Sequence, residues 1–129
     1  MREIKFRAWN GGMMRYLHLD EFTITQDGVY APNEMGEKWI QRDWPLMQYT
    51  GLKGKNGTEI YEGDVCEIEG GGEKTSVGKI IFEYGCFCFN PNGARWGAVH
   101  PELKYYVDME FCEIEVIGNI YENPELWED

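Results

Sequence analysis

Four cysteines are the residues of this 129-residue sequence best suited to chemistry. One residue separates Cys86 from Cys88, whereas Cys66 and Cys112 lie elsewhere in the chain. Four thiolates could bind zinc, but structural zinc sites usually hold cysteines in pairs with about two to four residues between them. Cys86 and Cys88 would instead share one face of a strand built from core residues. We therefore expect reduced thiols that pack as small hydrophobic side chains, with no metal and no cofactor.

The two histidines, His18 and His100, offer a second route to chemistry. A histidine can activate a distant cysteine once the fold brings the two together. No cysteine here lies in a sequence typical of a catalytic nucleophile, however. The spacing of Gly51, Gly54 and Gly57 does not match that of phosphate-binding loops, and no helix pattern follows. The sequence therefore predicts that the protein is not an enzyme, unless a deep pocket joins a histidine or cysteine to a carboxylate.

Charge is distributed unevenly along the chain, whose net charge is −11. Residues 1–50 contain 6 basic and 7 acidic residues, and residues 51–129 contain 6 basic and 16 acidic residues. An acidic surface repels nucleic-acid phosphates at long range. The composition therefore argues against a general nucleic-acid-binding protein, and solubility is the simplest explanation of the excess.

A candidate partner-binding surface consists of glutamates in the last part of the chain: Glu113, Glu115, Glu122 and Glu125. Alternation along Phe111–Ile117 would direct Glu113 and Glu115 outward together. Glu67 and Glu69 would share an outward face in the same way. Solvated strand faces explain such pairs more simply than a general acid and base. A regular band of carboxylates could also imitate DNA phosphates toward a host DNA-binding protein.

Basic side chains support the alternative hypothesis, direct binding of nucleic acid. Lys53 and Lys55 lie at the tip of a predicted loop and form the main positive spot of the acidic half. The N-terminal candidates are Arg7, Arg15, Arg2 and Lys5. Alternation along Glu3–Trp9 predicts a half-buried strand that directs Arg7 toward solvent. This hypothesis predicts a basic patch and salt-sensitive binding.

Aromatic side chains are numerous, and some could form a protein-binding surface beside acidic groups, as loops of SH3-type barrels often do. The candidates are Tyr49, Tyr61, Trp96, Tyr105, Tyr106 and Trp127. Aromatic residues bury large areas in protein cores. We therefore expect most of these side chains to fill the core.

Short alternating segments and frequent turn signals predict a mainly β fold, with an α+β fold as the alternative. Within Leu46–Val65, the pair Asn56-Gly57 predicts the turn of a β-hairpin. Other strands are expected at Met13–Leu19, Glu21–Thr25, Asp64–Glu69, Gly78–Tyr84, Cys86–Phe89, Leu103–Asp108 and Phe111–Ile117. Pro32–Arg42 stays open between a short helix and an extended segment, and residues 124–129 could form one helical turn.

The predicted elements divide into two subdomains. Residues 1–50 would form a small β or α+β subdomain, and residues 51–129 an SH3-like β-barrel, the two packed as one unit. No apolar run approaches the ~20 residues needed to cross a bilayer, and no signal peptide is visible. We therefore expect a soluble cytoplasmic protein. Strand edges in the first subdomain could pair two copies into a homo-oligomer.

Three segments show a resemblance to a known family. They are IKFRAWN (Ile4–Asn10), QYTGLKGKNGTEIYEGD (Gln48–Asp64) and VIGNIYENPEL (Val116–Leu126). Together they closely resemble the YopX family of small phage and prophage proteins. The resemblance implies a bacterial host and a two-part fold whose second part is SH3-like, and it implies no catalytic residues. We therefore expect a non-enzymatic accessory protein that binds a host or phage macromolecule.

Overall fold

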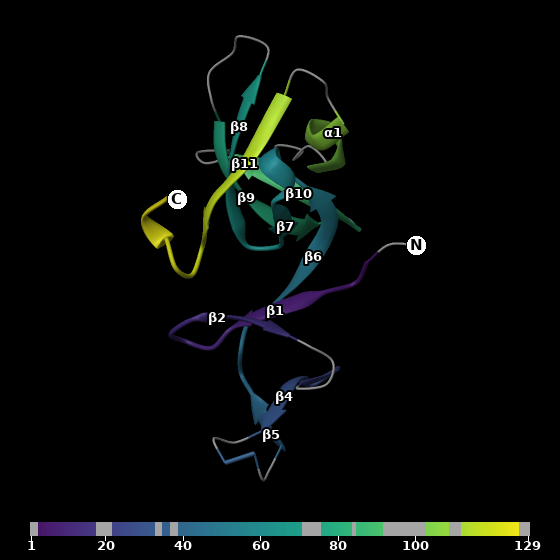
Figure 1. The fold of residues 1–129 in the computed structure, drawn as a ribbon, viewed down its shortest axis with the longest axis vertical. Coiled ribbons are helices and arrows are strands. Elements are labelled where there is room, and N and C mark those ends of the chain that lie inside the picture. The colour runs from purple at the N-terminus through teal and green to yellow at the C-terminus, as the bar shows by residue number, and fades with distance from the viewer. Residues whose placement is uncertain are drawn as a thin grey trace. The chain divides into compact units, whose positions relative to one another are not determined.

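The computed structural model describes residues 3–17, 22–32, 35–36, 39–70, 76–83, 85–91, 103–108 and 112–126. It consists mostly of antiparallel β-structure, which confirms the predicted mainly β fold. The chain forms two compact units, labelled by their elements in Figure 1. The N-terminal unit is Ile4–Gln48, and the C-terminal unit is Tyr49–Asp129 together with Met1–Glu3.

The N-terminal unit contains short strands in two sheets. They are β1 (Phe6–Trp9), β2 (Met14–Leu17), β3 (Thr23–Thr25), β4 (Gly28–Pro32), β5 (Trp39–Arg42) and the start of β6 (Leu46–Lys53). β1 pairs with β2 and β6, and β4 lies between β3 and β5. Because β5 is a strand, the region left open by the sequence is extended at Trp39–Arg42. The buried hydrophobic cluster described in this unit is small and consists of Phe22, Val29 and Ala31.

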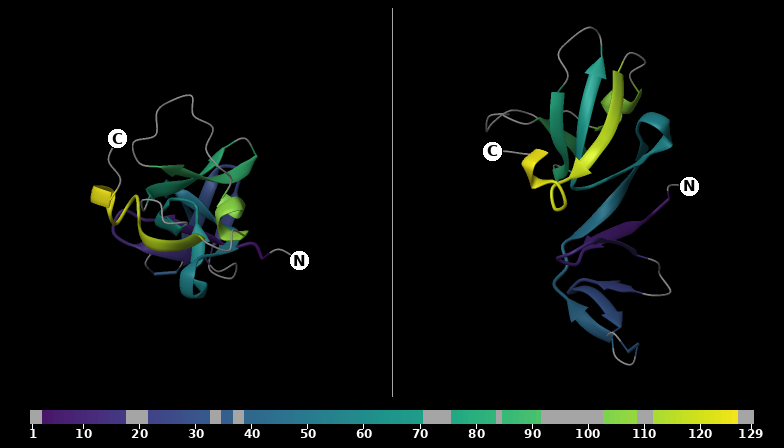
Figure 2. Two further views of the ribbon diagram at one scale, coloured as in Figure 1. Left: turned by 90° about the horizontal axis from the view of Figure 1, so that it is seen from above. Right: turned by 60° about the vertical axis from the view of Figure 1, so that its left-hand side comes forward.

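The C-terminal unit is built on one four-stranded sheet, in the order β10-β9-β8-β11. Its elements are the end of β6, η1 (Lys55–Gly57), β7 (Glu59–Tyr61), β8 (Asp64–Gly70), β9 (Ser76–Glu83), β10 (Cys86–Pro91), α1 (Leu103–Asp108), β11 (Cys112–Asn119) and η2 (Pro124–Leu126). The sheet curls into a half-barrel, as Figure 2 shows. The short η2 turn matches the helical turn predicted near the end of the chain.

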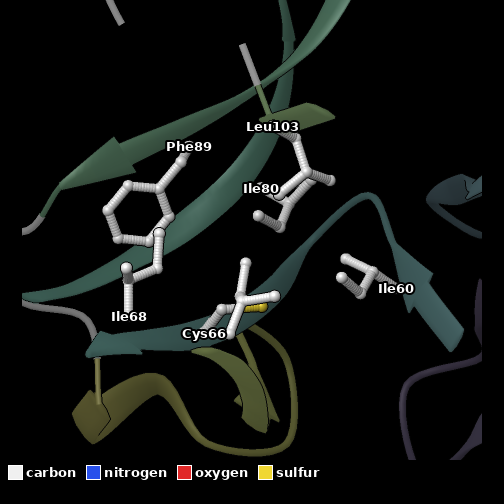
Figure 3. Close-up of a cluster of buried hydrophobic side chains, with 7 residues drawn as sticks. Ile60, Cys66, Ile68, Ile80, Phe89 and Leu103 are labelled. Carbon is white, nitrogen blue, oxygen red and sulfur yellow. The ribbon is translucent and has the colours of Figure 1, made fainter. Parts of the chain in front are cut away.

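A cluster of seven buried side chains fills the concave side of this sheet. It consists of Ile60, Cys66, Ile68, Ile80, Phe89, Leu103 and Ile114, most of which are labelled in Figure 3. Burying a large apolar side chain contributes about 1.5–3 kcal/mol each. The sheet of this unit is therefore held by a core of its own.

The segment Leu103–Asp108, predicted as a strand, is the helix α1, so that prediction was wrong. Leu103 belongs to the core cluster and Val107 packs against it, and residues four apart share one face of a helix. Lys104 and Asp108, also four apart, form an ion pair on the exposed side. The apolar residues of this segment fit the two-residue period of a strand as well as the period of a helix. Packing of Leu103 and Val107 on the core explains why a helix forms.

The segment Leu46–Val65 forms the predicted hairpin. Its loop turns at Asn56, which has φ 63° and ψ 19°, a left-handed conformation that asparagine tolerates better than most residues. Beyond the loop, the chain turns again between β7 and β8. Asp64 is buried and its carboxylate accepts a hydrogen bond from the Tyr61 N–H at 2.7 Å. The Gly63 N–H donates to the Ile80 carbonyl at 2.9 Å, which fixes this second turn to β9.

Candidate acidic binding surface

Four glutamates lie together on the outer face of the C-terminal sheet. β11 pairs with β8 so that Glu113 is opposite Glu69 and Glu115 is opposite Glu67. Glu69, Glu113 and Glu115 are exposed, and Glu67 is half-buried. The alternate residues Cys66, Ile68 and Ile114 face the core, so the pleat directs these glutamates away from it. We call Glu67, Glu69, Glu113 and Glu115 the acidic face.

The acidic face concentrates like charge at close range. Side chains directly opposite in an antiparallel pair have Cβ atoms about 4.5–5.5 Å apart, and alternate residues along a strand are about 6.6 Å apart. Like charges opposite each other destabilise a sheet. We therefore expect the arrangement to lower stability, which packing alone would not select.

The hairpin loop brings a cation to this face. Lys55 Nζ lies 3.4 Å from a carboxylate oxygen of Glu113, and both side chains are about half-exposed or more. The hairpin loop lies against β11, because a Cβ added at Gly54 would come within 2.6 Å of the Ile114 carbonyl oxygen. A lysine proposed to bind anions and a glutamate proposed to bind cations thus neutralise each other in part.

Glu122 and Glu125, the other two predicted acidic residues, follow β11 and lie outside its strand face. Both are exposed. Glu122 Oε1 accepts a hydrogen bond from Asn119 Nδ2 at 3.3 Å. Asn119 Oδ1 in turn accepts from the N–H groups of Tyr121 and Glu122, at 3.0 and 2.8 Å. The family-like segment around Asn119 is therefore a turn held by side-chain amides.

The structure divides the basic candidates. Arg7 was predicted to face solvent, but only 3% of it is exposed, so it is a poor contact for nucleic acid. Its neighbour Ala8 is also buried, and adjacent strand residues point to opposite faces, so both faces of β1 are covered at this point. The guanidinium of Arg15 lies 5.6 Å from the ring centre of Phe22. Lys53 is exposed, Lys5 is half-buried, and Arg2 lies outside the described residues.

The aromatic candidates that the structure describes are buried. Tyr49 and Tyr61 face each other across β6 and β7 with ring centres 5.4 Å apart, and each is 4% exposed. The side chains of Trp96, Tyr105, Tyr106 and Trp127 lie outside the description. Phe82, which was not among these candidates, is exposed near the end of β9 and packs on Phe87.

The residues considered for catalysis and for a four-thiolate metal site lie only partly in the described part of the chain. His18 and His100 lie outside it. Within it, no three side chains of histidine, cysteine, aspartate or glutamate converge as metal ligands, and none of the four cysteines forms a disulfide. No described helix has the length and apolar character needed to span a membrane.

Known proteins match nearly the whole length of the chain. A family model described as "YopX protein" matches residues 5–128. The chain is similar to the solved structure of yopX from Bacillus subtilis, with a TM-score of 0.65, 24% identity and 99% and 100% of the two chains covered. It is also similar to EF1440 from Enterococcus faecalis, with a TM-score of 0.59, 26% identity and the same coverage. No curated protein matches the chain.

Proposed function

The chain belongs to the YopX family, and we propose that it acts as a non-enzymatic binding module in the cytoplasm of a bacterial host. In this proposal the acidic face contacts a positively charged surface of a host or phage protein. The family match supports a shared fold and leaves the activity to be inferred from the surface.

The observation that supports this proposal is the cross-strand pairing of Glu67 with Glu115 and of Glu69 with Glu113. A sheet that only needed solubility could stagger its carboxylates or place lysine opposite glutamate, which would stabilise the pairing. Instead, two pairs of like charges lie side by side. A cationic partner would remove the repulsion, so part of the cost of forming the face would be recovered on binding.

In a narrower form of the proposal, the acidic face imitates DNA toward a DNA-binding protein. The four carboxylates form a regular two-by-two array, and the C-terminal unit contributes most of the net charge of −11. Proteins that bind DNA use lysine and arginine to neutralise phosphates, and most of their non-specific affinity is electrostatic. A compact carboxylate array would compete for the same cationic side chains.

The experiment compares two double variants that lose the same charge. Glu69→Gln with Glu115→Gln removes one member of each cross-strand pair and leaves the Lys55–Glu113 ion pair. Glu122→Gln with Glu125→Gln removes two charges outside the acidic face. Binding to a lysine- and arginine-rich peptide is measured at low salt, and we expect the first variant to weaken it by about fivefold or more and the second by less than about twofold.

Equal losses in the two variants would mean that net charge alone drives the binding, and the proposal would then be wrong. For the narrower form, bacterial DNA-binding proteins are loaded on DNA-cellulose and eluted with the protein. We expect the unmodified protein and the second variant to release some of them, and the first variant to release less. Retention of the protein itself on bare DNA-cellulose would instead support direct nucleic-acid binding.

A further inference from the structure

Cys86 and Cys88 form a pair of thiols that the proposed function does not use. They are alternate residues at the start of β10, so their side chains lie on the same face of the strand. Their sulfur atoms are 3.5 Å apart without a bond between them. Cys88 is 2% exposed, whereas Cys86 is half-buried and lines a pocket of about 320 Å³. The pair is therefore reachable from solvent through Cys86.

A third atom completes a triangle with these two sulfur atoms. The carbonyl oxygen of Glu83, which pairs with Cys86 across the β9–β10 hairpin, lies 3.5 Å from Cys86 Sγ and 3.8 Å from Cys88 Sγ. The three sides of the triangle are thus nearly equal. Each thiol is placed to donate a hydrogen bond to this oxygen, so the two sulfur atoms and the oxygen are all in mutual contact.

The dimensions of this triangle fit a tetrahedral metal ion. With zinc–sulfur bonds of about 2.3 Å and a zinc–oxygen bond of about 2.1 Å, tetrahedral angles separate the two sulfur atoms by about 3.8 Å and each sulfur from the oxygen by about 3.6 Å. The observed distances are 3.5, 3.5 and 3.8 Å. Shifts of a few tenths of an ångström would therefore satisfy the geometry.

A disulfide fits the same residues less well. Bonded sulfur atoms are about 2.05 Å apart and their Cβ atoms about 3.8 Å apart. Alternate residues in a strand have Cα atoms about 6.6 Å apart, near the upper limit for a disulfide. Closing the bond would require the backbone of β10 to bend, whereas a metal ion bridges the sulfur atoms where they lie.

We propose that Cys86 Sγ, Cys88 Sγ and the carbonyl oxygen of Glu83 form a binding site for a thiophilic divalent cation of the zinc class. Both thiols lose their protons on binding, because thiolates are the ligands. The fourth position is left for water or for an atom of another molecule, since no further thiolate, imidazole or carboxylate joins the pair in the described part of the chain. A site with this composition would bind more weakly than one with four protein thiolates.

This site differs from the four-cysteine site that the sequence brings to mind. Cys66 lies in the core, and Cys112 at the start of β11 pairs with Gly70 at the end of β8. Ser76, at the start of β9, pairs with Ile68 near the end of β8. Glu83, at the other end of β9, pairs with Cys86. The strand register therefore places Cys112 and Cys86 at opposite ends of the sheet, and Cys112 is a suitable control.

The test uses the reduced, metal-free full chain and zinc alone as the probe. Zinc is titrated against a chromophoric chelator, and cadmium titration gives a second readout through the ultraviolet charge-transfer band of bound thiolate. We expect one ion per chain and release of about two protons per ion. Cys86→Ser should weaken zinc binding by about tenfold or more, and Cys112→Ser by less than about twofold.

Cys88→Ser should have the same effect as Cys86→Ser, provided that near-ultraviolet circular dichroism shows the variant to be folded. Cys86→Ser carries the test by itself if Cys88→Ser does not fold, because Cys86 is half-exposed. Absence of saturable zinc binding would overturn the proposal. Binding that survives Cys86→Ser, or that is lost in Cys112→Ser, would also overturn it, since the ligands would then lie elsewhere.

Discussion

The two units differ in what they show to solvent. In the described part of the N-terminal unit, six large hydrophobic side chains are exposed: Ile4, Met13, Tyr16, Met35, Trp39 and Ile40. The described part of the C-terminal unit exposes one, Phe82. Charge follows the opposite order, because Ile4–Gln48 contains 5 basic and 6 acidic residues and the rest of the chain 7 and 17. One unit is nearly neutral with apolar surface, and the other is acidic with its apolar side chains buried.

The two units also differ in how much buried core stabilises them. Among the described residues, the buried cluster of the C-terminal unit has seven members, whereas that of the N-terminal unit has three. Small units bury a smaller share of their surface and gain less from burial. We therefore expect the C-terminal unit to dominate the stability of the chain while bearing a face whose charges oppose folding. A homo-oligomer formed through the N-terminal unit stays a prediction, which equilibrium sedimentation would test.

The largest expected effect on stability comes from removing one large side chain from the core of each unit. Phe89→Ala in the C-terminal unit should reduce the free energy of unfolding by about 3–5 kcal/mol. Phe22→Ala, the matched change in the N-terminal unit, should cost about 3 kcal/mol or less, because a small cluster collapses more readily around the lost ring. Urea unfolding measures both, and amide exchange assigns each loss to its unit. A larger cost at Phe22 would reverse the ranking of the two cores.

A somewhat smaller effect is expected at the turn between β7 and β8. Asp64→Ala removes the buried carboxylate that accepts a hydrogen bond from the Tyr61 N–H. The free energy of unfolding should fall by about 2–3 kcal/mol. Asp108→Ala removes an exposed carboxylate of the same unit and should cost less than about 1 kcal/mol. If both changes cost the same in thermal unfolding, the turn is not a stabilising element.

The hairpin loop gives a third comparison. Gly54→Ala places a Cβ within 2.6 Å of the Ile114 carbonyl oxygen, so the loop must move away from β11. We expect a loss of about 1–3 kcal/mol, because overpacking forces backbone shifts. Gly12→Ala in the N-terminal unit meets only Asn10 Oδ1 at 3.7 Å and should change stability by about 0.5 kcal/mol or less. Similar unfolding midpoints for the two variants would contradict the close approach.

Local sequence signals predicted much of this fold. Alternation placed most strands, and Asn56-Gly57 located the hairpin turn. The failures occurred where the sequence pattern was ambiguous. Leu103–Asp108 fits both periods, and its helix depends on a core formed by distant strands. Arg7 alternates as a solvent-facing residue should, yet it lies in a central strand and is buried.

The acidic face shows the same limit for a functional surface. Alternation predicted that Glu113 and Glu115 point outward together, and the same for Glu67 and Glu69. It could not predict that the two pairs meet, because the register between β8 and β11 joins segments more than forty residues apart. Alternation therefore predicted the outward pair on each strand, and only the structure shows that the two pairs form one face. Glu122 and Glu125, chosen for proximity in the sequence, lie outside it.

The smallest predicted effect tests whether the acidic face costs stability. Glu69→Gln with Glu115→Gln removes the repulsion across both strand pairs, so it should raise the free energy of unfolding by about 0.2–1 kcal/mol at low salt. Salt screens repulsion between exposed charges, so the gain should shrink as salt approaches about 1 M. Urea unfolding at two salt concentrations measures this change.

Glu122→Gln with Glu125→Gln is the matched control, since it changes the net charge equally without touching the paired glutamates. If the control gains as much, general repulsion in an acidic unit explains the effect. If only the first variant gains stability and also loses affinity for the cationic peptide, the same four carboxylates oppose folding and favour binding. Such opposition is expected of a functional surface, because selection for binding keeps groups that stability alone would replace.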